Sequence, residues 1–212
     1  MKHFGKVLML VLSLAAVPAQ AARPAWGYLD FAYLANESDD TDPVTKKIEA
    51  DGGRFNVSIP VAPWMYFTGE YNHADFDTSK QQLRDTSLGL GVHTLNRNYQ
   101  FFSAATYERT DVFGTDSTDE GYALQFGARV PFLERYEVQG DFKWLDFGKT
   151  PAGVTPRFDR LRLTTLAHLS KTWAFVGTYQ SVDYRGGIDK AWTAGFRATF
   201  NTQYDVPSKP TP

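Results

Sequence analysis

The stretch Phe67-Thr68-Gly69-Glu70-Tyr71 decides the fold, because its pattern recurs three more times along the chain. Each copy is apolar at alternate residues, small in the middle and aromatic at its end, and an aspartate follows four residues later. The other copies lie at residues 101–107, 138–142 and 175–179. The aspartates lie 36, 35 and 37 residues apart, at Asp75, Asp111, Asp146 and Asp183. A near-constant period indicates one supersecondary unit used repeatedly, and the alternation indicates that this unit is a β-hairpin.

The whole chain can be divided into such hairpins, so the sequence predicts an all-β, antiparallel, up-and-down transmembrane barrel, with ten strands favoured. The predicted strands are residues 26–35, 54–61, 65–74, 83–93, 99–110, 122–130, 136–147, 160–169, 173–184 and 191–200. Short connections alternate with longer polar ones, as expected when turns lie on one side of a membrane and loops on the other. The connection Arg185-Gly186-Gly187 is short where a long one is expected, so eight strands remain the alternative.

The alternation also predicts what each face of a strand contacts. In the strand at 160–169, Leu161 and Leu163 alternate with Arg160 and Arg162, which gives one apolar and one polar face. A half-solvated soluble sheet shows the same alternation, but it does not collect aromatic residues at both strand ends as a membrane interface does. One predicted belt contains Trp26, Trp64, Tyr66, Tyr99, Tyr136 and Trp173, and the other contains Tyr71, Tyr107, Phe142, Trp144, Tyr179 and Trp192.

The two ends of the chain lie outside the predicted barrel. A basic and then apolar start leads to the cleavage-site pattern Ala19-Gln20-Ala21, so residues 1–21 are predicted to be a secretory signal peptide. Their apolar run is too short to span a bilayer as a helix. Residues 22–200 would form the barrel, and the proline-containing residues 201–212 would form a flexible periplasmic tail.

The composition excludes several classes of function. The chain has 22 basic and 24 acidic residues, and this mildly acidic balance argues against a nucleic-acid partner. It has no cysteine, which excludes disulfides and thiol chemistry. No cofactor or metal is expected, because the acidic stretch with Asp39, Asp40 and Asp42 lacks the glycine and terminal glutamate of a dedicated calcium loop.

The last predicted strand carries the most specific local motif: a polar residue, a glycine two residues later, and alternate apolar positions ending in an aromatic ring. The motif residues are Thr193, Gly195, Ala198 and Phe200. With the signal peptide and the repeat, this motif makes the chain resemble the small outer-membrane β-barrel proteins of Gram-negative bacteria. The resemblance implies location in the outer membrane as a monomer, with membrane lipid and lipopolysaccharide as surroundings. It also implies that the barrel-assembly machinery binds the closing motif.

The polar faces of the strands predict a charged barrel interior. The residues assigned to it are Asp30, Arg54, Glu70, Arg84, Glu108, Arg129, Glu137, Asp141, Lys143, Arg160, Arg162 and Arg197. Eight strands leave an interior just filled by side chains, so opposite charges in a ten-stranded bore are predicted to pair and occlude it. The leading hypothesis is therefore a non-enzymatic protein with a structural or surface-interaction role. The alternative is a narrow channel for ions or small solutes, and a lipid-modifying enzyme comes third.

Two further patterns suggest sharper functions. His168-Leu169-Ser170 resembles the histidine–serine arrangement of a lipid A deacylase family, but no glutamate follows Glu137 to orient the histidine as that family requires. His73 with Asp75 is the nearest match to a protease site, and it lacks the second carboxylate pair. The periodic aspartates are expected to start turns. The alternative is that they form a carboxylate ring at the external rim, binding divalent cations that bridge to lipopolysaccharide phosphate.

Overall fold

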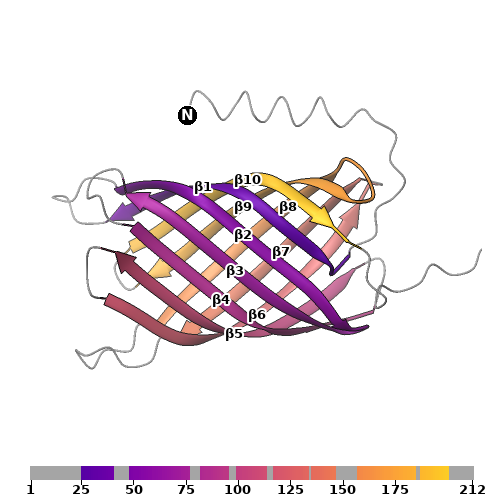
Figure 1. Ribbon diagram of the computed structural model, residues 1–212, viewed down its shortest axis with the longest axis horizontal. Helices are drawn as coiled ribbons and strands as arrows, with labels where there is room; N and C mark the ends of the chain where they lie inside the picture. Colours follow the sequence, from indigo (N-terminus) through magenta and orange to yellow (C-terminus); the bar gives the residue numbers. More distant parts are fainter. Residues whose placement is uncertain are drawn as a thin grey trace, which may run out of the picture.

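The computed structural model describes residues 25–40, 48–76, 82–95, 99–113, 117–133, 135–146, 157–184 and 187–200, and within these ranges the chain forms ten strands (Figure 1). The strands are β1 (Tyr28–Asp40), β2 (Ile48–Ala62), β3 (Met65–Phe76), β4 (Gln82–His93), β5 (Gln100–Phe113), β6 (Ser117–Phe132), β7 (Tyr136–Asp146), β8 (Arg157–His168), β9 (Trp173–Tyr184) and β10 (Gly187–Thr199). No helix in these ranges is long and apolar enough to cross a membrane. The predicted signal peptide and tail lie outside the described residues and stay predictions.

The ten strands close into one antiparallel barrel, which confirms the ten-strand prediction. The seam joins β1 to β10 along their whole length, from Tyr28 opposite Thr199 to Asp40 opposite Gly187, and Figure 1 shows the two tilted strands side by side. β1 begins and β10 ends at the same end of the barrel. In bacterial barrels the chain ends and short turns lie on the periplasmic side, so we call this the periplasmic end and the opposite one the external end.

Several strands extend further toward the external end than the sequence pattern predicted. β1 continues to Asp40, β2 begins at Ile48 and β6 begins at Ser117. The side chains in these extensions are mostly polar and show no apolar alternation, so they were assigned to loops. A backbone ladder needs only paired N–H and C=O groups, and it can therefore continue into water beyond the membrane.

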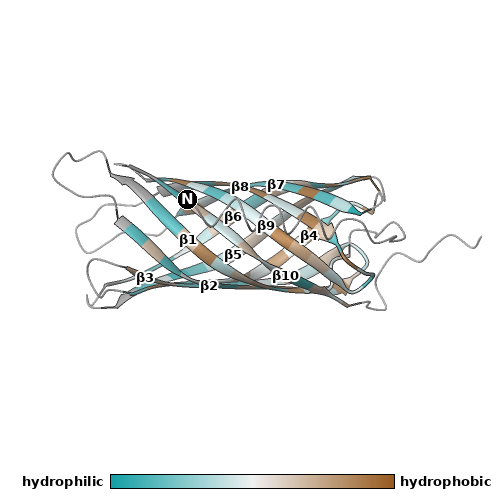
Figure 2. Ribbon diagram, turned by 90° about the horizontal axis from the view of Figure 1, so that it is seen from above, coloured by the Kyte–Doolittle hydropathy of each residue, from teal (hydrophilic) through white to brown (hydrophobic). Residues whose placement is uncertain are grey.

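The outward face of the barrel is apolar, as contact with lipid requires. Phe101 is 57% exposed and Leu161 is 60% exposed, values that a soluble protein would not repeat around its whole surface. Others of this kind are Phe31, Leu88, Leu90, Leu124, Phe126, Leu163 and Phe196. Apolar and polar segments alternate along the strands in Figure 2, so each strand has one face toward lipid and one toward the bore.

Two residues of the predicted aromatic belts lie elsewhere. Trp64, Tyr99 and Trp173 are exposed at the periplasmic rim, as the belt prediction requires. Trp26 and Tyr66 are instead buried inside the barrel, with 5% and 3% exposure. The inward position of Tyr66 follows from the alternation, because Tyr66 lies on the same face of β3 as Glu70. The belt prediction relied instead on closeness to the strand end, which does not determine the face.

The closing motif lies at the seam between β1 and β10. A Cβ atom added to Gly195 would lie 1.9 Å from the carbonyl oxygen of Phe31, so the two strands approach each other at a distance that glycine alone permits without movement. Phe200 follows the last residue of β10, and its N–H donates to the carbonyl of Gly27 at 2.9 Å. The predicted motif therefore completes the closure of the barrel, while its binding by assembly machinery stays a prediction.

Candidate functional site

The bore of the barrel holds most of the charged residues assigned to it. Eleven of the twelve are buried: Asp30, Arg54, Glu70, Glu108, Arg129, Glu137, Asp141, Lys143, Arg160, Arg162 and Arg197. Six of these eleven are basic and five are acidic, so their charges nearly balance. Burial of so many ionised groups is tolerated only where each finds a partner.

The centre of the bore is crossed by arginines that converge on Glu70. Arg160 and Arg162 donate to its two carboxylate oxygens through Nη1, at 3.1 and 2.7 Å, and Arg54 donates through Nη2 at 3.1 Å. Glu70 lies on β3 and the first two arginines lie on β8, five strands away in a closed ring of ten. These ion pairs therefore join opposite walls. Arg162 also donates from Nε to Asp141 at 2.9 Å, which extends the network to β7.

A second cluster joins three strands beside this crossing. The Lys143 ammonium on β7 pairs with Glu108 on β5 and donates to Ser87 Oγ on β4 at 3.0 Å. Sequence reasoning missed this serine–lysine contact, which resembles a nucleophile and its base. Ser87 Oγ in turn donates to Glu108 Oε1 at 2.8 Å, so the serine proton is directed at the carboxylate and not at the lysine. The contact is therefore structural, with lysine as the donor.

Aromatic rings fill the bore at its periplasmic end. Trp26, just before β1, stacks on Tyr66 and His93 with ring centroids 4.3 and 4.4 Å apart, and its Nε1 donates to Gln100 on β5 at 2.9 Å. The guanidinium of Arg129 lies 4.7 Å from the Trp26 ring centroid, a cation–π contact. We call the five side chains of Trp26, Tyr66, His93, Phe102 and Arg129 the aromatic plug. Sequence reasoning missed it because two members had been assigned to the lipid-facing belt.

A glycine makes room for the aromatic plug. Gly91 lies opposite Tyr66 on the neighbouring strand β4. A Cβ atom at position 91 would lie 2.3 Å from Cζ of the Tyr66 ring, well inside contact distance. The ring therefore occupies the space that any other side chain at position 91 would need.

Arg84 is the one predicted lumen residue that the structure places elsewhere. On β4 the inward residues are Leu83, Asp85 and Ser87, which line the bore, so Arg84 lies on the outward face. It stands opposite Asp111 of β5. The prediction was wrong because it assigned the residue by charge, whereas the alternation with outward-facing Leu88 places position 84 outside.

The four periodic aspartates lie at the external ends of alternate strands. Asp75, Asp111, Asp146 and Asp183 are on the outward faces of β3, β5, β7 and β9, within the last three residues of each strand. Asp111 accepts hydrogen bonds from Arg109 Nε at 3.1 Å and Thr118 Oγ1 at 2.8 Å. Within the described residues, no three His, Asp or Glu side chains lie close enough to share a metal ion. The cation-bridging role of this ring stays a prediction.

The residues of the deacylase-like pattern are divided between the bore and a turn. His168 Nε2 lies 4.0 Å from Glu137 Oε2, so a glutamate does approach the histidine from the preceding strand. Ser170 Oγ accepts hydrogen bonds from the N–H groups of Thr172 and Trp173 at 3.2 and 3.0 Å. Ser170 thus stabilises the turn between β8 and β9. The side chains of the acidic stretch at 39–42 lie outside the described part of the chain.

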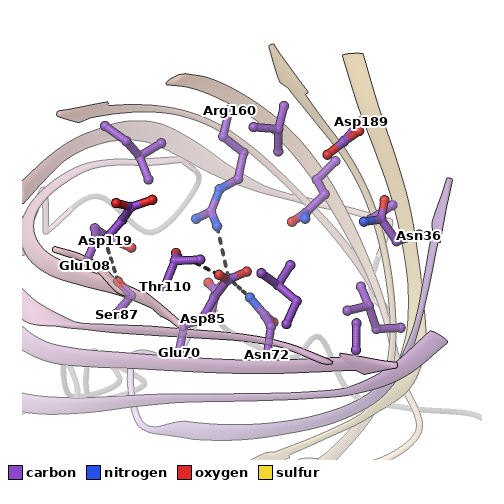
Figure 3. A pocket seen from close by; sticks show the side chains of 17 residues that line it. Asn36, Glu70, Asn72, Asp85, Ser87, Glu108, Thr110, Asp119, Arg160 and Asp189 are labelled. Carbon is purple, nitrogen blue, oxygen red and sulfur yellow. Dashed lines mark hydrogen bonds and ion pairs between the residues drawn. The ribbon is translucent and has the colours of Figure 1, made fainter. Parts of the chain in front are cut away.

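The external half of the bore is hollow. A cavity of about 250 Å³ lies above the ion pairs, lined by side chains from most of the strands (Figure 3). Glu70 and Arg160 form part of its floor and wall, and shorter side chains such as Ala74 and Ala191 line its upper part. The same barrel therefore has a filled periplasmic half and an open external half.

No family model matches the sequence, and no curated protein is similar enough in sequence to count as a relative. Among solved structures, the chain is similar to the KdgM porin in complex with disordered oligogalacturonate, at 10% identity and a TM-score of 0.45, over 81% of this chain and 99% of the porin. OprG from Pseudomonas aeruginosa matches at 12% identity and 0.45, over 87% and 100%. Neisserial surface protein A matches at 11% identity and 0.41, over 82% and 96%.

These matches include a porin and a surface protein, so they concern the barrel and leave the role of this chain open. The chain is a closed antiparallel β-barrel of ten strands. Its location in the outer membrane stays the prediction made from the sequence.

Proposed function

We propose that this protein is a non-enzymatic outer-membrane barrel with a closed bore, whose role is structural or lies in interactions at the membrane surface. The observation that carries the proposal is the contact of Glu70 on β3 with Arg160 and Arg162 on β8. Because these strands lie on opposite walls, an ion passing through the bore would have to separate charged groups that hold each other across its full width.

The energetics support a closed rather than merely narrow bore. Each ion pair has a raw attraction of roughly 4 kcal/mol at 4 Å and an effective dielectric constant near 20, and desolvation cancels much of it. The network therefore need not add net stability. Removing one partner, however, leaves a buried charge, so opening the bore without replacing the lost contacts is costly.

The aromatic plug supports closure at a second level. It fills the periplasmic end of the bore with Arg129 and with rings that contact one another. Arg129 also donates from Nη1 to the carbonyl of Ala25 at 3.1 Å. A conducting path would thus require two separate rearrangements.

The narrow-channel alternative has less support. Selective pores place charges of one sign around a constriction, whereas the closed part of this bore contains buried side chains of both signs. An enzymatic role also has less support, because Ser170 is used in a turn and Lys143 is paired with Glu108.

The proposal is tested by planar-bilayer recordings on the refolded full chain. We expect no steady conductance from the wild-type protein and measurable openings from the double variant Arg129→Ala/Arg162→Ala, which removes one guanidinium from each of the two closed levels. The control is Arg109→Ala, which removes an exposed ion pair with Asp111 on the outer face and leaves the bore intact. Large, stable currents from the wild-type protein would overturn the proposal and favour the channel.

A further inference from the structure

Carboxylates line the hollow external end of the bore. Asp85, Asp119 and Asp189 lie there, above Glu70 and Glu108. Asp85 accepts a hydrogen bond from Thr110 Oγ1 at 2.9 Å, and within the described residues it forms no ion pair. Among the described residues that line the cavity, five side chains are acidic and Arg160 alone is basic, so the cavity favours a positively charged group.

The opposite wall offers an unused donor. The Arg160 side chain is only 9% exposed and donates from Nη1 to Glu70, while its Nε and Nη2 atoms have no hydrogen-bond partner among the described residues. Figure 3 shows this guanidinium reaching down into the cavity from β8. Buried donors left unpaired cost free energy, so this side of the cavity favours an acceptor with negative charge.

Asn72 completes the set on the acidic side. It lines the same cavity, and its Oδ1 atom is buried and has no hydrogen-bond partner among the described residues. Asn72 lies opposite Asp85 across the β3–β4 pair, so an unused acceptor and a carboxylate stand together. The wall carrying Arg160 faces them from the other side of the barrel (Figure 3).

We propose that this external cavity is a binding site for a small zwitterion, a molecule with an ammonium group at one end and a carboxylate at the other. The ammonium would donate to Asp85 and to the Asn72 oxygen, and the carboxylate would accept from Arg160. The cavity of about 250 Å³ suits a short linear molecule, and Leu83 and Val182, on opposite sides of the cavity, provide apolar contacts for its methylene groups. This site adds a binding function to the closed-bore role. The ion pairs beneath the cavity prevent a bound molecule from crossing the barrel.

The test uses the refolded full chain in a non-ionic detergent and isothermal titration with three ligands: 4-aminobutyrate, butylamine and butyrate. We expect 4-aminobutyrate to bind at least about tenfold more tightly than either singly charged ligand, because only it satisfies both walls. Equal binding of butylamine would show a cation site and overturn the zwitterion assignment. Absence of binding by all three ligands would overturn the site itself.

Two aspartate variants localise the binding. Asp85→Asn should weaken 4-aminobutyrate binding by about tenfold, since a charged hydrogen bond becomes a neutral one. Its matched control is Asp75→Asn, the same change on the outward face, where the carboxylate lies 3.5 Å from His73 and outside the cavity. Heat-modifiable migration on a gel would confirm that both variants fold. Equal weakening by both would indicate a general effect of charge and contradict the proposed site.

Discussion

The two halves of the bore are built from the same ten strands and yet are packed in opposite ways. The periplasmic half is filled by the rings of Trp26, Tyr66 and Phe102 and, above them, by the ion pairs of Glu70. The external half leaves a cavity of about 250 Å³. Strand number sets the width of a barrel, and the width does not change between the halves. The size of the inward side chains therefore decides where the bore is closed.

The difference lies in which residues occupy the inward positions. In the closed half they are aromatic rings and long arginines, which reach the opposite wall. In the hollow half they include Ala74, Ala191 and Asp85, which are too short to do so. Variants that shorten a long inward residue should therefore have large effects, and variants in the hollow half should have small ones.

The largest effect is expected from Arg162→Ala, which removes the pairs with Glu70 and Asp141 and leaves two buried carboxylates with fewer partners. Breaking a buried ion pair in this way costs about 3–5 kcal/mol. Urea unfolding of the refolded protein would measure the loss in the free energy of unfolding. Arg109→Ala should cost much less, because the pair that it removes is exposed and screened by solvent. Equal losses from the two variants would mean that the central network contributes no more than a surface pair.

Trp26→Ala is expected to loosen the aromatic plug. The change removes a buried ring stacked between Tyr66 and His93 and should cost about 3 kcal/mol. Because the ion pairs above still close the bore, the single variant should show no conductance in planar bilayers. The double variant with Arg162→Ala should conduct more than Arg162→Ala alone.

The control for this prediction is Trp64→Ala, which removes an exposed indole at the membrane rim and should leave conductance unchanged. Currents from Trp26→Ala by itself would show that the plug is the only barrier.

Gly91→Ala is expected to have an intermediate effect. The added methyl group would overlap the Tyr66 ring, and overpacking of this kind costs about 1–3 kcal/mol. Gly140→Ala is the matched control, since a Cβ atom there meets nothing within 4 Å. Thermal unfolding in detergent should separate the two variants. A loss at Gly140 as large as that at Gly91 would contradict the packing role assigned to Gly91.

Residue alternation was enough to predict the facing of most of the charged residues. Glu70 and Arg162 could be placed in the bore because each shares a face with polar neighbours along its strand. The same rule, applied strictly, would have placed Arg84 outside and Tyr66 inside. Both errors came from letting residue type override the period of two. The facing was therefore available in the sequence, even where the prediction was wrong.

The pairing across the bore could not be predicted in the same way. Which arginine meets Glu70 depends on the stagger between strands that are far apart in the chain, and that stagger is fixed only when β1 pairs with β10. The cavity was unpredictable for a related reason. It arises where inward residues at one height, among them Ala74, Asp85 and Ala191, do not reach the opposite wall. That is a property of the closed barrel and of no single strand.

The smallest effect is expected where the bore is hollow, and a pair of identical substitutions tests this directly. In the closed half, the Asp141 carboxylate accepts hydrogen bonds from Arg162 at 2.9 Å and Gln125 at 2.7 Å. Asp141→Asn replaces these charged hydrogen bonds by weaker neutral ones and should lower the free energy of unfolding by about 2 kcal/mol. Asp85→Asn in the cavity removes one charge among several carboxylates and should change the free energy of unfolding by less than about 0.5 kcal/mol. Urea titrations of both variants would measure the difference. If Asp85→Asn proved the more damaging, the external half would have to be regarded as part of the packed interior, and the contrast between the two halves would fail.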